Sequence, residues 1–352
     1  MTPDARNTSL PLIMLTLLTG IALGWLLNDL VQRPPAPAIV APTGVPAAPS
    51  PEVTAAPATV TRAAATMPPP AVATPTIVPA PAATPAITPE PVIAGYVGHR
   101  VAAGETLEQI AARYGTSPAL IMSYNLLDAP PRVGRELVVP VSDAAGDGDV
   151  LLVQRGGQQP WIALTLDAGA GAAPTPRILD ALRERGVTIT FFLTGKWIRD
   201  NPDLVRQMVA DGHELANHTM NHPDLTTLDE GAIRRELAET EALLREIAPG
   251  ATTRPFFRPP YGAYDERVLR VTLAEGYLPV YWTLDSLDSV GEPKTPAFLL
   301  ERVTQKLAPE ELHGAIILAH CGSEATADAL PQILDQFAAM GFEVRKLSEV
   351  MR

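Results

Sequence analysis

Apolar and polar residues are arranged in different ways along this chain, and each arrangement predicts a different kind of structure. Residues 10–27 are apolar almost throughout, and the stretch from Asn7 to Asn28 carries no charge. Since a helix rises about 1.5 Å per residue, about 20 such residues cross a hydrocarbon layer of about 30 Å. We therefore predict a transmembrane signal anchor over residues 10–30, behind a tail of residues 1–9. A cleaved signal peptide is the alternative.

Residues 31–94 show neither helical nor strand periodicity and are rich in proline, alanine and threonine. Seventeen of the chain's 37 prolines lie between Pro34 and Pro91. Proline removes backbone hydrogen-bond donors, and a stretch without aromatic residues buries too little apolar surface to fold. We predict a disordered linker that acts as a spacer.

The pattern in residues 95–142 predicts a small βααβ module. A short strand near Gly98 leads into a helix that Thr106 can cap and Gly115 can end. A second helix over Ser117 to Tyr124 and a strand over Gly134 to Pro140 complete the order. Such a module closes around a very small core.

Residues 160–352 follow a second linker, residues 143–159, and alternate strand-like apolar runs with helical patterns. This alternation is typical of parallel strands joined by crossover helices, in an open sheet or a barrel. The expected strands are 162–167, 188–193, 213–217, 256–258, 277–284, 315–320 and 342–344. The expected helices are 175–185, 202–211, 229–247, 265–275, 296–307 and 326–340. The fold class of this part is therefore α/β.

Composition narrows the functional classes. The hydrophobic share of 46% is that of an ordinary globular protein, so a compact part must accompany the proline-rich one. A formal charge of −12 argues against a nucleic-acid binder, which needs a basic face. The single cysteine, Cys321, excludes an internal disulfide and a multi-cysteine metal site. Because it follows His320 on an expected strand, its thiol should point to the opposite face and be buried.

Polar side chains fall where the expected strands end, which is where parallel α/β folds place their chemistry. They are Asp167, His218 with His222, Arg258, Asp285 with Asp288, and His320. Two neutral imidazoles four residues apart can face one metal ion, and a carboxylate can complete a three-ligand site with water in the fourth position. A histidine pair alone is often only packed in a core, but five strand ends offering such groups favour a site.

The module at 95–142 closely resembles a LysM domain. The resemblance rests on the Gly-Glu-Thr-Leu turn from Gly104, the Ile-Ala-x-x-Tyr-Gly helix end from Ile110, Asn125, and the Gly-x-x-Leu-x-Val-Pro finish from Gly134. It implies binding of glycans that contain N-acetylglucosamine, such as peptidoglycan or chitin. The implied contacts lie in two loops, at Gly104, Glu105 and Thr106 and at Leu126, Leu127 and Asp128. A module that only spaces its neighbours is the alternative.

Residues 160–352 resemble the NodB-homology polysaccharide deacetylases, carbohydrate esterase family 4. His218-Thr-Met-Asn-His222 matches the family's metal-binding motif, Arg258-Pro-Pro-Tyr-Gly262 the third motif, Asp285-Ser-Leu-Asp288 the fourth and Leu318-Ala-His320 the fifth. The resemblance implies a distorted, incomplete (β/α) barrel. It also implies a divalent metal, with Zn²⁺ expected and Co²⁺ as an alternative, and removal of acetyl groups from N-acetylated sugars.

The same resemblance implies a role for each matched residue. His218 and His222 would hold the metal, with Asp167 as a further candidate ligand, while Asp167, oriented by Arg258, would act as general base. The backbone N–H of Tyr261 would stabilise the oxyanion. His320, held by Asp288, would protonate the departing amine. The acetyl pocket would be lined by Leu318, Trp282 and Asp285.

One position departs from the family pattern. The first motif, Thr-Phe-Asp-Asp-Gly, reads here Thr165-Leu-Asp-Ala-Gly169, so Ala168 replaces a metal-ligand aspartate. Three outcomes are open: Asp167 turns to the metal, water fills the missing position, or metal affinity and activity are lost. A lost carboxylate should weaken metal binding in any case. Ser289 also stands where the fourth motif is usually followed by Trp.

These features lead to one main functional hypothesis and two alternatives. The main one is a membrane-anchored, extracytoplasmic enzyme that deacetylates N-acetylglucosamine or N-acetylmuramic acid in peptidoglycan. The first alternative is a non-catalytic glycan-binding wall protein with a metal-deficient deacetylase domain. The second is a chitooligosaccharide deacetylase. The expected partners are an N-acetylated glycan and the membrane, or the glycan alone if the N-terminal segment is cleaved and the protein secreted.

Overall fold

The computed structural model describes residues 93–142 and 148–352, all within one compact unit that spans Ala83–Arg352. The predicted anchor at 10–30, and the predicted linker at 31–94 apart from its last two residues, lie outside the described residues. Within the two described ranges, no helix combines the length and the apolar character that crossing a membrane requires.

The N-terminal part of the described chain is a small module with the order strand, helix, helix, strand. Its elements are β1 (Gly95–Arg100), α2 (Leu107–Tyr114), α3 (Pro118–Tyr124) and β2 (Glu136–Val141), and the two strands pair antiparallel. Thr106 caps α2 by accepting from the N–H of Gln109, whose side chain in turn accepts from the N–H of Thr106. Gly115 ends the helix at a φ of 63°, a left-handed conformation that glycine adopts without strain.

The module packs against the rest of the compact unit through a few defined contacts. The hydroxyl of Tyr124 donates to the carbonyl of Gly276 at 2.7 Å. Val138 of β2 belongs to the same buried apolar cluster as Phe256 and Leu278 of the larger part. The two parts therefore share buried apolar surface.

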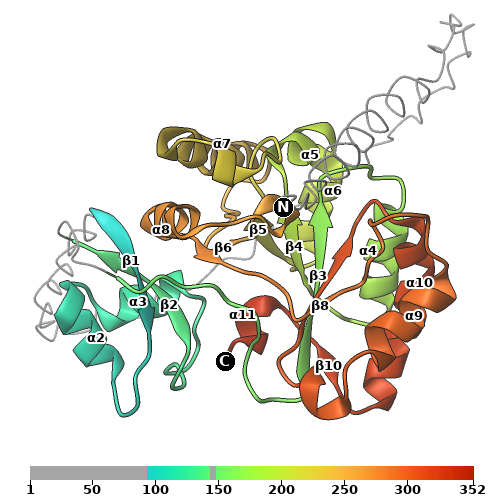
Figure 1. The fold of residues 1–352 in the computed structure, drawn as a ribbon, viewed down its shortest axis with the longest axis horizontal. Helices are drawn as coiled ribbons and strands as arrows, with labels where there is room; N and C mark the ends of the chain where they lie inside the picture. Colours follow the sequence, from blue (N-terminus) through green and yellow to red (C-terminus); the bar gives the residue numbers. More distant parts are fainter. Residues whose placement is uncertain (1–92, 143–147) are drawn as a thin grey trace, which may run out of the picture. The chain divides into compact units, whose positions relative to one another are not determined.

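The larger part is built on an eight-stranded sheet whose strand pairs are all parallel, as the alternating sequence pattern predicted (Figure 1). The strands are β3 (Trp161–Ala168), β4 (Thr190–Leu193), β5 (Glu214–Asn217), β6 (Phe256–Phe257), β7 (Leu278–Pro279), β8 (Leu284–Asp285), β9 (Ile316–His320) and β10 (Glu343–Val344). Their order is β7-β6-β5-β4-β3-β9-β8, with β10 paired to β3. Strand β3, which carries Asp167, therefore lies in the middle of the sheet.

The single strand predicted over residues 277–284 is wrong, because this stretch forms two strands at opposite ends of the sheet order. Strand β7 pairs with β6 and β8 pairs with β9. Between them the backbone changes partners: the N–H of Val280 donates to Phe257, and the N–H of Thr283 donates to Ile316. Four residues thus carry the chain from one end of the sheet to the other, which produces an incomplete barrel.

Helices connect the strands and cover the sheet. They are α4 (Thr175–Glu184), α5 (Gly195–Asp200), α6 (Pro202–Ala210), α7 (Glu230–Ile247), α8 (Glu266–Ala274), α9 (Pro296–Gln305), α10 (Glu324–Ala339) and α11 (Leu347–Val350), with short 3-10 turns η1 (Leu225–Thr227), η2 (Pro260–Gly262) and η3 (Pro309–Leu312). Figure 1 shows α4, α9 and α10 gathered on one side of the sheet. Helix α10 starts two residues earlier than predicted because the Ser323 hydroxyl caps its first turn.

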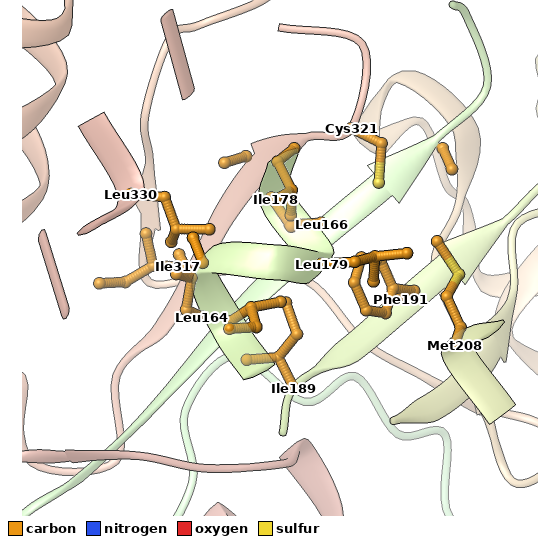
Figure 2. Packing of buried hydrophobic residues seen from close by; sticks show 14 of the residues in the cluster. Leu164, Leu166, Ile178, Leu179, Ile189, Phe191, Met208, Ile317, Cys321 and Leu330 are labelled. Atoms are coloured by element: carbon orange, nitrogen blue, oxygen red, sulfur yellow. The ribbon is translucent and has the colours of Figure 1, made fainter. Parts of the chain in front are cut away.

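The side chains of β3 separate into two environments. Ile162, Leu164, Leu166 and Ala168 belong to one apolar cluster, which includes Ile178 and Leu179 of α4 (Figure 2). The residues between them, including Ala163 and Asp167, point to the opposite face, as period-two alternation requires. Asp167 and Ala168 are therefore neighbours in sequence with opposite surroundings.

Candidate active site

Four of the predicted site residues meet at the carboxyl ends of central strands. Asp167 lies beside His320 in the pairing of β3 with β9. His218 directly follows β5, and Arg258 directly follows β6, which pairs with β5. Because parallel strands end at one edge, residues up to 153 positions apart in the chain come together here.

Asp167 and Arg258 form a buried ion pair. Nη1 of Arg258 donates to Oδ1 of Asp167 at 2.6 Å, and their residues are 0% and 5% exposed. The guanidinium also lies over the ring of Phe192, 4.0 Å from its centroid, and its Nη2 donates to the carbonyl of Tyr281. Burial lowers the pKa of Arg258, and Asp167 opposes that shift. The pair fixes one oxygen of Asp167 and leaves Oδ2 for other contacts.

His218 turns its free nitrogen towards that second oxygen. Its Nδ1 lies 2.9 Å from the carbonyl of Arg258, and since a carbonyl only accepts, Nδ1 carries the proton. The unprotonated Nε2 lies 3.5 Å from Oδ2 of Asp167. Burial lowers the pKa of His218 in spite of Asp167, so the imidazole is neutral. A neutral imidazole is the form that binds metals.

His222 completes the predicted histidine pair. Its ring centroid lies 4.8 Å from that of His218, with the two planes at 73°. Burial, together with His218, lowers its pKa to about 4. Both imidazoles are therefore neutral at physiological pH and close together.

The loop that carries this pair has an unusual backbone, which spacing alone did not reveal. Thr219 and His222 have φ values of 67° and 61°, which are uncommon for residues other than glycine. The side-chain oxygen of Asn217 accepts from the N–H of Thr219, and its amide donates to the carbonyl of Leu237. Asn217 is fully buried and so holds the loop in shape. Its only sequence signal is its place just before His218.

His320 and Asp288 form the second predicted pair. Nδ1 of His320 lies 2.7 Å from Oδ1 of Asp288, and the backbone N–H of His320 donates to Oδ2 at 2.9 Å. Burial alone would lower the pKa of His320, but the hydrogen bond and charge of Asp288 outweigh it and raise the pKa. The next residue, Cys321, is buried in the apolar cluster, as predicted, and burial raises the pKa of its thiol.

Tyr261 borders the histidine pair with an exposed side chain. Its residue is 72% exposed, and its ring centroid lies 4.5 Å from that of His222. Its backbone is left-handed, with a φ of 59° inside the turn η2. Strained conformations of this kind concentrate at functional sites.

The three predicted pocket residues lie on β8, on β9 and just before β8. Leu318 is buried two residues before His320, so both point to the same face of β9. Trp282 stacks on Tyr281 at 3.9 Å, and its ring lies 5.8 Å from the Arg258 guanidinium. Asp285 accepts from the N–H of Leu287 at 2.7 Å, so its side chain caps a turn.

In the N-terminal module, the first predicted glycan-binding loop is occupied by internal contacts. Glu105 points inward: its Oε2 lies 2.8 Å from Nε2 of His99 and accepts from the N–H of Ala102. That backbone hydrogen bond is the main cause that lowers the pKa of Glu105. Thr106 caps α2, and Gly104 supplies a φ of 77°. These three residues therefore shape the loop.

The second predicted glycan-binding loop is more open. Leu126 is 40% exposed and has a φ of 54°, while Leu127 is half-buried against the module's core. Asp128 is exposed and pairs with Arg352 at 2.7 Å. This loop could therefore contact a ligand mainly through its backbone and apolar surface, and less through charged groups.

The donors present fit a divalent ion in part. His218 and His222 are neutral imidazoles, and Oδ2 of Asp167 is the nearest carboxylate oxygen to His218. Across residues 93–142 and 148–352, no three His, Cys, Asp or Glu side chains are gathered closely enough to hold an ion together. The site thus offers two neutral imidazoles with Asp167 beside them.

Ala168 explains why a third ligand is missing. Its side chain is fully buried in the apolar cluster on the helix-covered face of β3, opposite to Asp167. A methyl group has no lone pair to give a cation. The two histidines therefore stay predicted metal ligands, and the third family position contributes only packing.

Comparisons with known proteins place this site in a family. A family model described as polysaccharide deacetylase matches residues 154–280, and a LysM domain model matches residues 99–140. A chitooligosaccharide deacetylase of Sinorhizobium fredii is 34% identical over 203 residues, which cover 54% of this chain and 91% of the relative. The peptidoglycan-N-acetylmuramic acid deacetylase PdaA of Bacillus subtilis is 31% identical over 225 residues, covering 63% and 81%.

Solved structures agree. Bacillus subtilis PdaA, a family 4 carbohydrate esterase, superposes with a TM-score of 0.54 at 31% identity over 57% of this chain and 85% of that one. BA3943 from Bacillus anthracis, named a CE4 family pseudoenzyme, gives 0.53 at 26% identity over 67% and 82%. A BA3943 mutant named for restored enzymatic activity gives 0.53 at 29% identity over 61% and 78%. These relatives confirm the predicted enzyme class, a polysaccharide deacetylase hydrolase. The chain belongs to the polysaccharide deacetylase family, carbohydrate esterase family 4, and carries a LysM domain before the deacetylase domain.

Proposed function

We propose that this protein is a metal-dependent N-deacetylase that hydrolyses the N-acetyl groups of peptidoglycan. One observation carries the proposal: Oδ1 of Asp167 is held by the buried Arg258, while Oδ2 faces the free nitrogen of a neutral His218. A carboxylate fixed in this way is positioned to take a proton from a water molecule near the two histidines. The name of PdaA, a peptidoglycan deacetylase, supports the substrate class.

The metal would be held by His218 and His222, with water in the position that Ala168 leaves without a ligand. A divalent ion there would polarise the acetamide carbonyl and lower the pKa of a bound water. Zn²⁺ suits two imidazoles, and Co²⁺ accepts the same ligands. With two protein ligands, such an ion would be bound more weakly than in a three-ligand site.

The chain's own residues supply the proton transfers. Asp167 takes the proton of the attacking water as general base, while Arg258 holds its carboxylate in place. The backbone N–H of Tyr261 donates to the developing oxyanion. His320, whose pKa is raised by the hydrogen bond and charge of Asp288, gives its proton to the departing sugar amine. Asp288 fixes the ring of His320 through Nδ1 and so presents Nε2 to the substrate.

The other parts of the chain would bring this site to its substrate. We propose that residues 10–30 anchor the protein in the membrane and that the linker of residues 31–94 extends it into the cell wall. The LysM domain of residues 95–142 would bind N-acetylglucosamine along the same glycan, with residues 143–159 joining it to the deacetylase domain of residues 160–352. Pocket contacts from Leu318, Trp282 and Asp285 would enclose the acetyl group.

The test measures acetate released from bacterial peptidoglycan by the purified chain with added Zn²⁺ or Co²⁺. We expect release from the wild-type protein and none above background from Asp167→Asn or His320→Ala. Chitooligosaccharides assayed in parallel separate the two substrate classes. A wild-type rate equal to that of Asp167→Asn on both substrates would defeat the proposal.

A second candidate function is a wall protein that binds glycan without hydrolysing it. Two observations favour it: Ala168 points into the apolar cluster, and a similar structure, BA3943, is named a pseudoenzyme. This candidate predicts that the chain sediments with insoluble peptidoglycan and releases no acetate at any Zn²⁺ concentration. Both candidates bind glycan, so acetate release is the measurement that decides between them.

A further inference from the structure

Two hydroxyl groups lie next to the His320 pair and have no role in the mechanism above. Oγ1 of Thr326, in the first turn of α10, donates to Oδ2 of Asp288 at 2.6 Å. Oγ of Ser289 lies 3.4 Å from Nε2 of His320. With the contact between His320 and Asp288, these bonds form a continuous chain in the order Thr326, Asp288, His320, Ser289.

The middle of this hydrogen-bond series depends on Asp288, whose carboxylate oxygens must accept hydrogen bonds. Its side chain is 0% exposed, and a buried carboxylate is costly unless its oxygens accept hydrogen bonds. Oδ1 accepts from Nδ1 of His320, and Oδ2 accepts from the His320 N–H and from Thr326. Because an ionised carboxylate only accepts, Nδ1 of His320 must carry the proton, and Nε2 becomes the nitrogen that faces the site.

Thr326 is well placed to fix this carboxylate. The residue is 3% exposed, and its N–H donates to the hydroxyl of Ser323, which caps α10. Its own hydroxyl is thus anchored to the start of a 16-residue helix, where the partial positive charge of the helix also favours an anion. Without that hydroxyl, Oδ2 keeps only the backbone N–H of His320, and the carboxylate gains freedom to rotate.

The hydroxyl of Ser289 can hydrogen-bond Nε2 of His320 whether or not that nitrogen carries a proton. A hydroxyl has one hydrogen to donate and lone pairs to accept with. It can accept from Nε2–H when His320 is protonated, and it can donate to Nε2 after the proton has left. Ser289 is exposed, whereas Thr326 at the opposite end of this hydrogen-bond series is buried.

We propose that Thr326 and Ser289 are positioning residues for His320. Thr326 fixes Asp288, and through it the ring plane and the tautomer, while Ser289 limits rotation at Nε2. The proposal deepens the proposed function and rests on it for its kinetic consequences. A positioning role acts on the proton transfer and not on glycan binding, so it predicts a lower kcat with an unchanged KM.

The kinetic test compares substitutions of Thr326 and Ser289, the two ends of the hydrogen-bond series, with a matched control. Thr326→Val removes the hydroxyl and keeps the shape, and Thr326→Ser restores it; Ser289→Ala and Ser289→Thr do the same at the other end. The control is Thr304→Val in α9, because Thr304 is also buried, at 2%, and its hydroxyl only bonds the carbonyl of Leu300 in its own helix.

We expect Thr326→Val to lower kcat for acetate release by about tenfold, a typical effect of losing a hydrogen bond that orients a functional side chain. Ser289→Ala should lower it less, and Thr326→Ser and Ser289→Thr should recover most of the loss, with KM within about twofold throughout. Thr304→Val should retain the wild-type kcat. A Thr326→Val protein with wild-type kcat, or an equal loss in Thr304→Val, would overturn the proposal.

A measurement that needs no activity separates this proposal from the proposed function. Proton NMR of the full chain should show the Nδ1–H of His320 as a downfield signal protected from exchange with water. Thr326→Val should weaken or abolish that signal, and Thr326→Ser should retain it. If no variant releases acetate but the signal follows this order, the proposed function fails while the positioning holds. An unchanged signal in Thr326→Val would refute the positioning.

Discussion

The buried pair of Asp167 and Arg258 gives a sharp prediction about stability. Arg258→Met removes the guanidinium but keeps an unbranched side chain, and it leaves the Asp167 carboxylate buried with no ionic partner. Charge centres about 4 Å apart interact by about 4 kcal/mol at an effective dielectric constant of about 20. Breaking a buried pair by removing one partner typically costs about 3–5 kcal/mol. We expect Arg258→Met to lower the free energy of unfolding by that amount.

The double-mutant cycle shows whether the cost belongs to the pair. Asp167→Asn alone leaves the buried Arg258 without its counter-charge, whereas the double variant removes both charges together. The double variant should therefore be no less stable than Arg258→Met, so the coupling energy should be at least as large as the cost of Asp167→Asn alone.

Urea unfolding without added metal, followed by tryptophan fluorescence, measures all four proteins. The control is Arg177→Met, because Arg177 is 49% exposed in its contacts with Glu324 and Asp328 and should change stability by less than about 1 kcal/mol. Additive effects of Arg258→Met and Asp167→Asn, or a loss below about 1 kcal/mol for Arg258→Met, would refute the reasoning.

Three further predictions concern pH, metal and backbone. Asp288 raises the pKa of His320, and the acid must be protonated to act, so kcat/KM should fall as pH rises through that pKa. Asp288→Asn should move this descending limb of the pH profile to lower pH. A limb that does not move would show that His320 is not the acid. Ala168→Asp places a carboxylate among buried apolar side chains, so the melting temperature of this variant should fall in chelator and recover with Zn²⁺. Equal melting temperatures in both conditions would exclude metal binding by the new carboxylate. Gly276→Ala should lower the free energy of unfolding by about 1–3 kcal/mol, because φ is 83° and a Cβ would lie 2.1 Å from the hydroxyl of Tyr124. Gly250→Ala, at a φ of 89° but with open space around the Cβ, should lower it less in thermal unfolding. Equal losses in the two variants would contradict the close contact at Gly276.

The gathering of the site residues could be predicted from the sequence because parallel strands end at a common edge. Asp167, His218, Arg258 and His320 each follow an apolar run, so their approach follows from the fold class alone. The ion pair of Arg258 with Asp167 and the contact of His320 with Asp288 were expected from the family resemblance, and the structure has both.

Other features depend on partners that no spacing reveals. Thr326 lies 38 residues beyond Asp288, and only the folded chain brings the start of α10 to that carboxylate. The split of residues 277–284 into β7 and β8 depends on which strands the backbone meets on each side. Glu105 was expected to contact glycan, but its carboxylate is bonded to His99, which lies six residues before it.

We expect that the alanine at position 168, in place of the family's aspartate, weakens the metal site without abolishing catalysis. The most direct measurement is the rate of acetate release from peptidoglycan as a function of Zn²⁺ concentration, for the wild-type chain and for Ala168→Asp. Residue 168 is the last of β3, so a turn of the strand end would bring an aspartate there out of the apolar cluster and towards the histidines. We predict that both rates rise with Zn²⁺ and saturate, and that Ala168→Asp reaches half-saturation at a Zn²⁺ concentration lower by about tenfold, or about 1.4 kcal/mol. Zinc-dependent release by Ala168→Asp with none by the wild-type chain at any concentration would contradict the account.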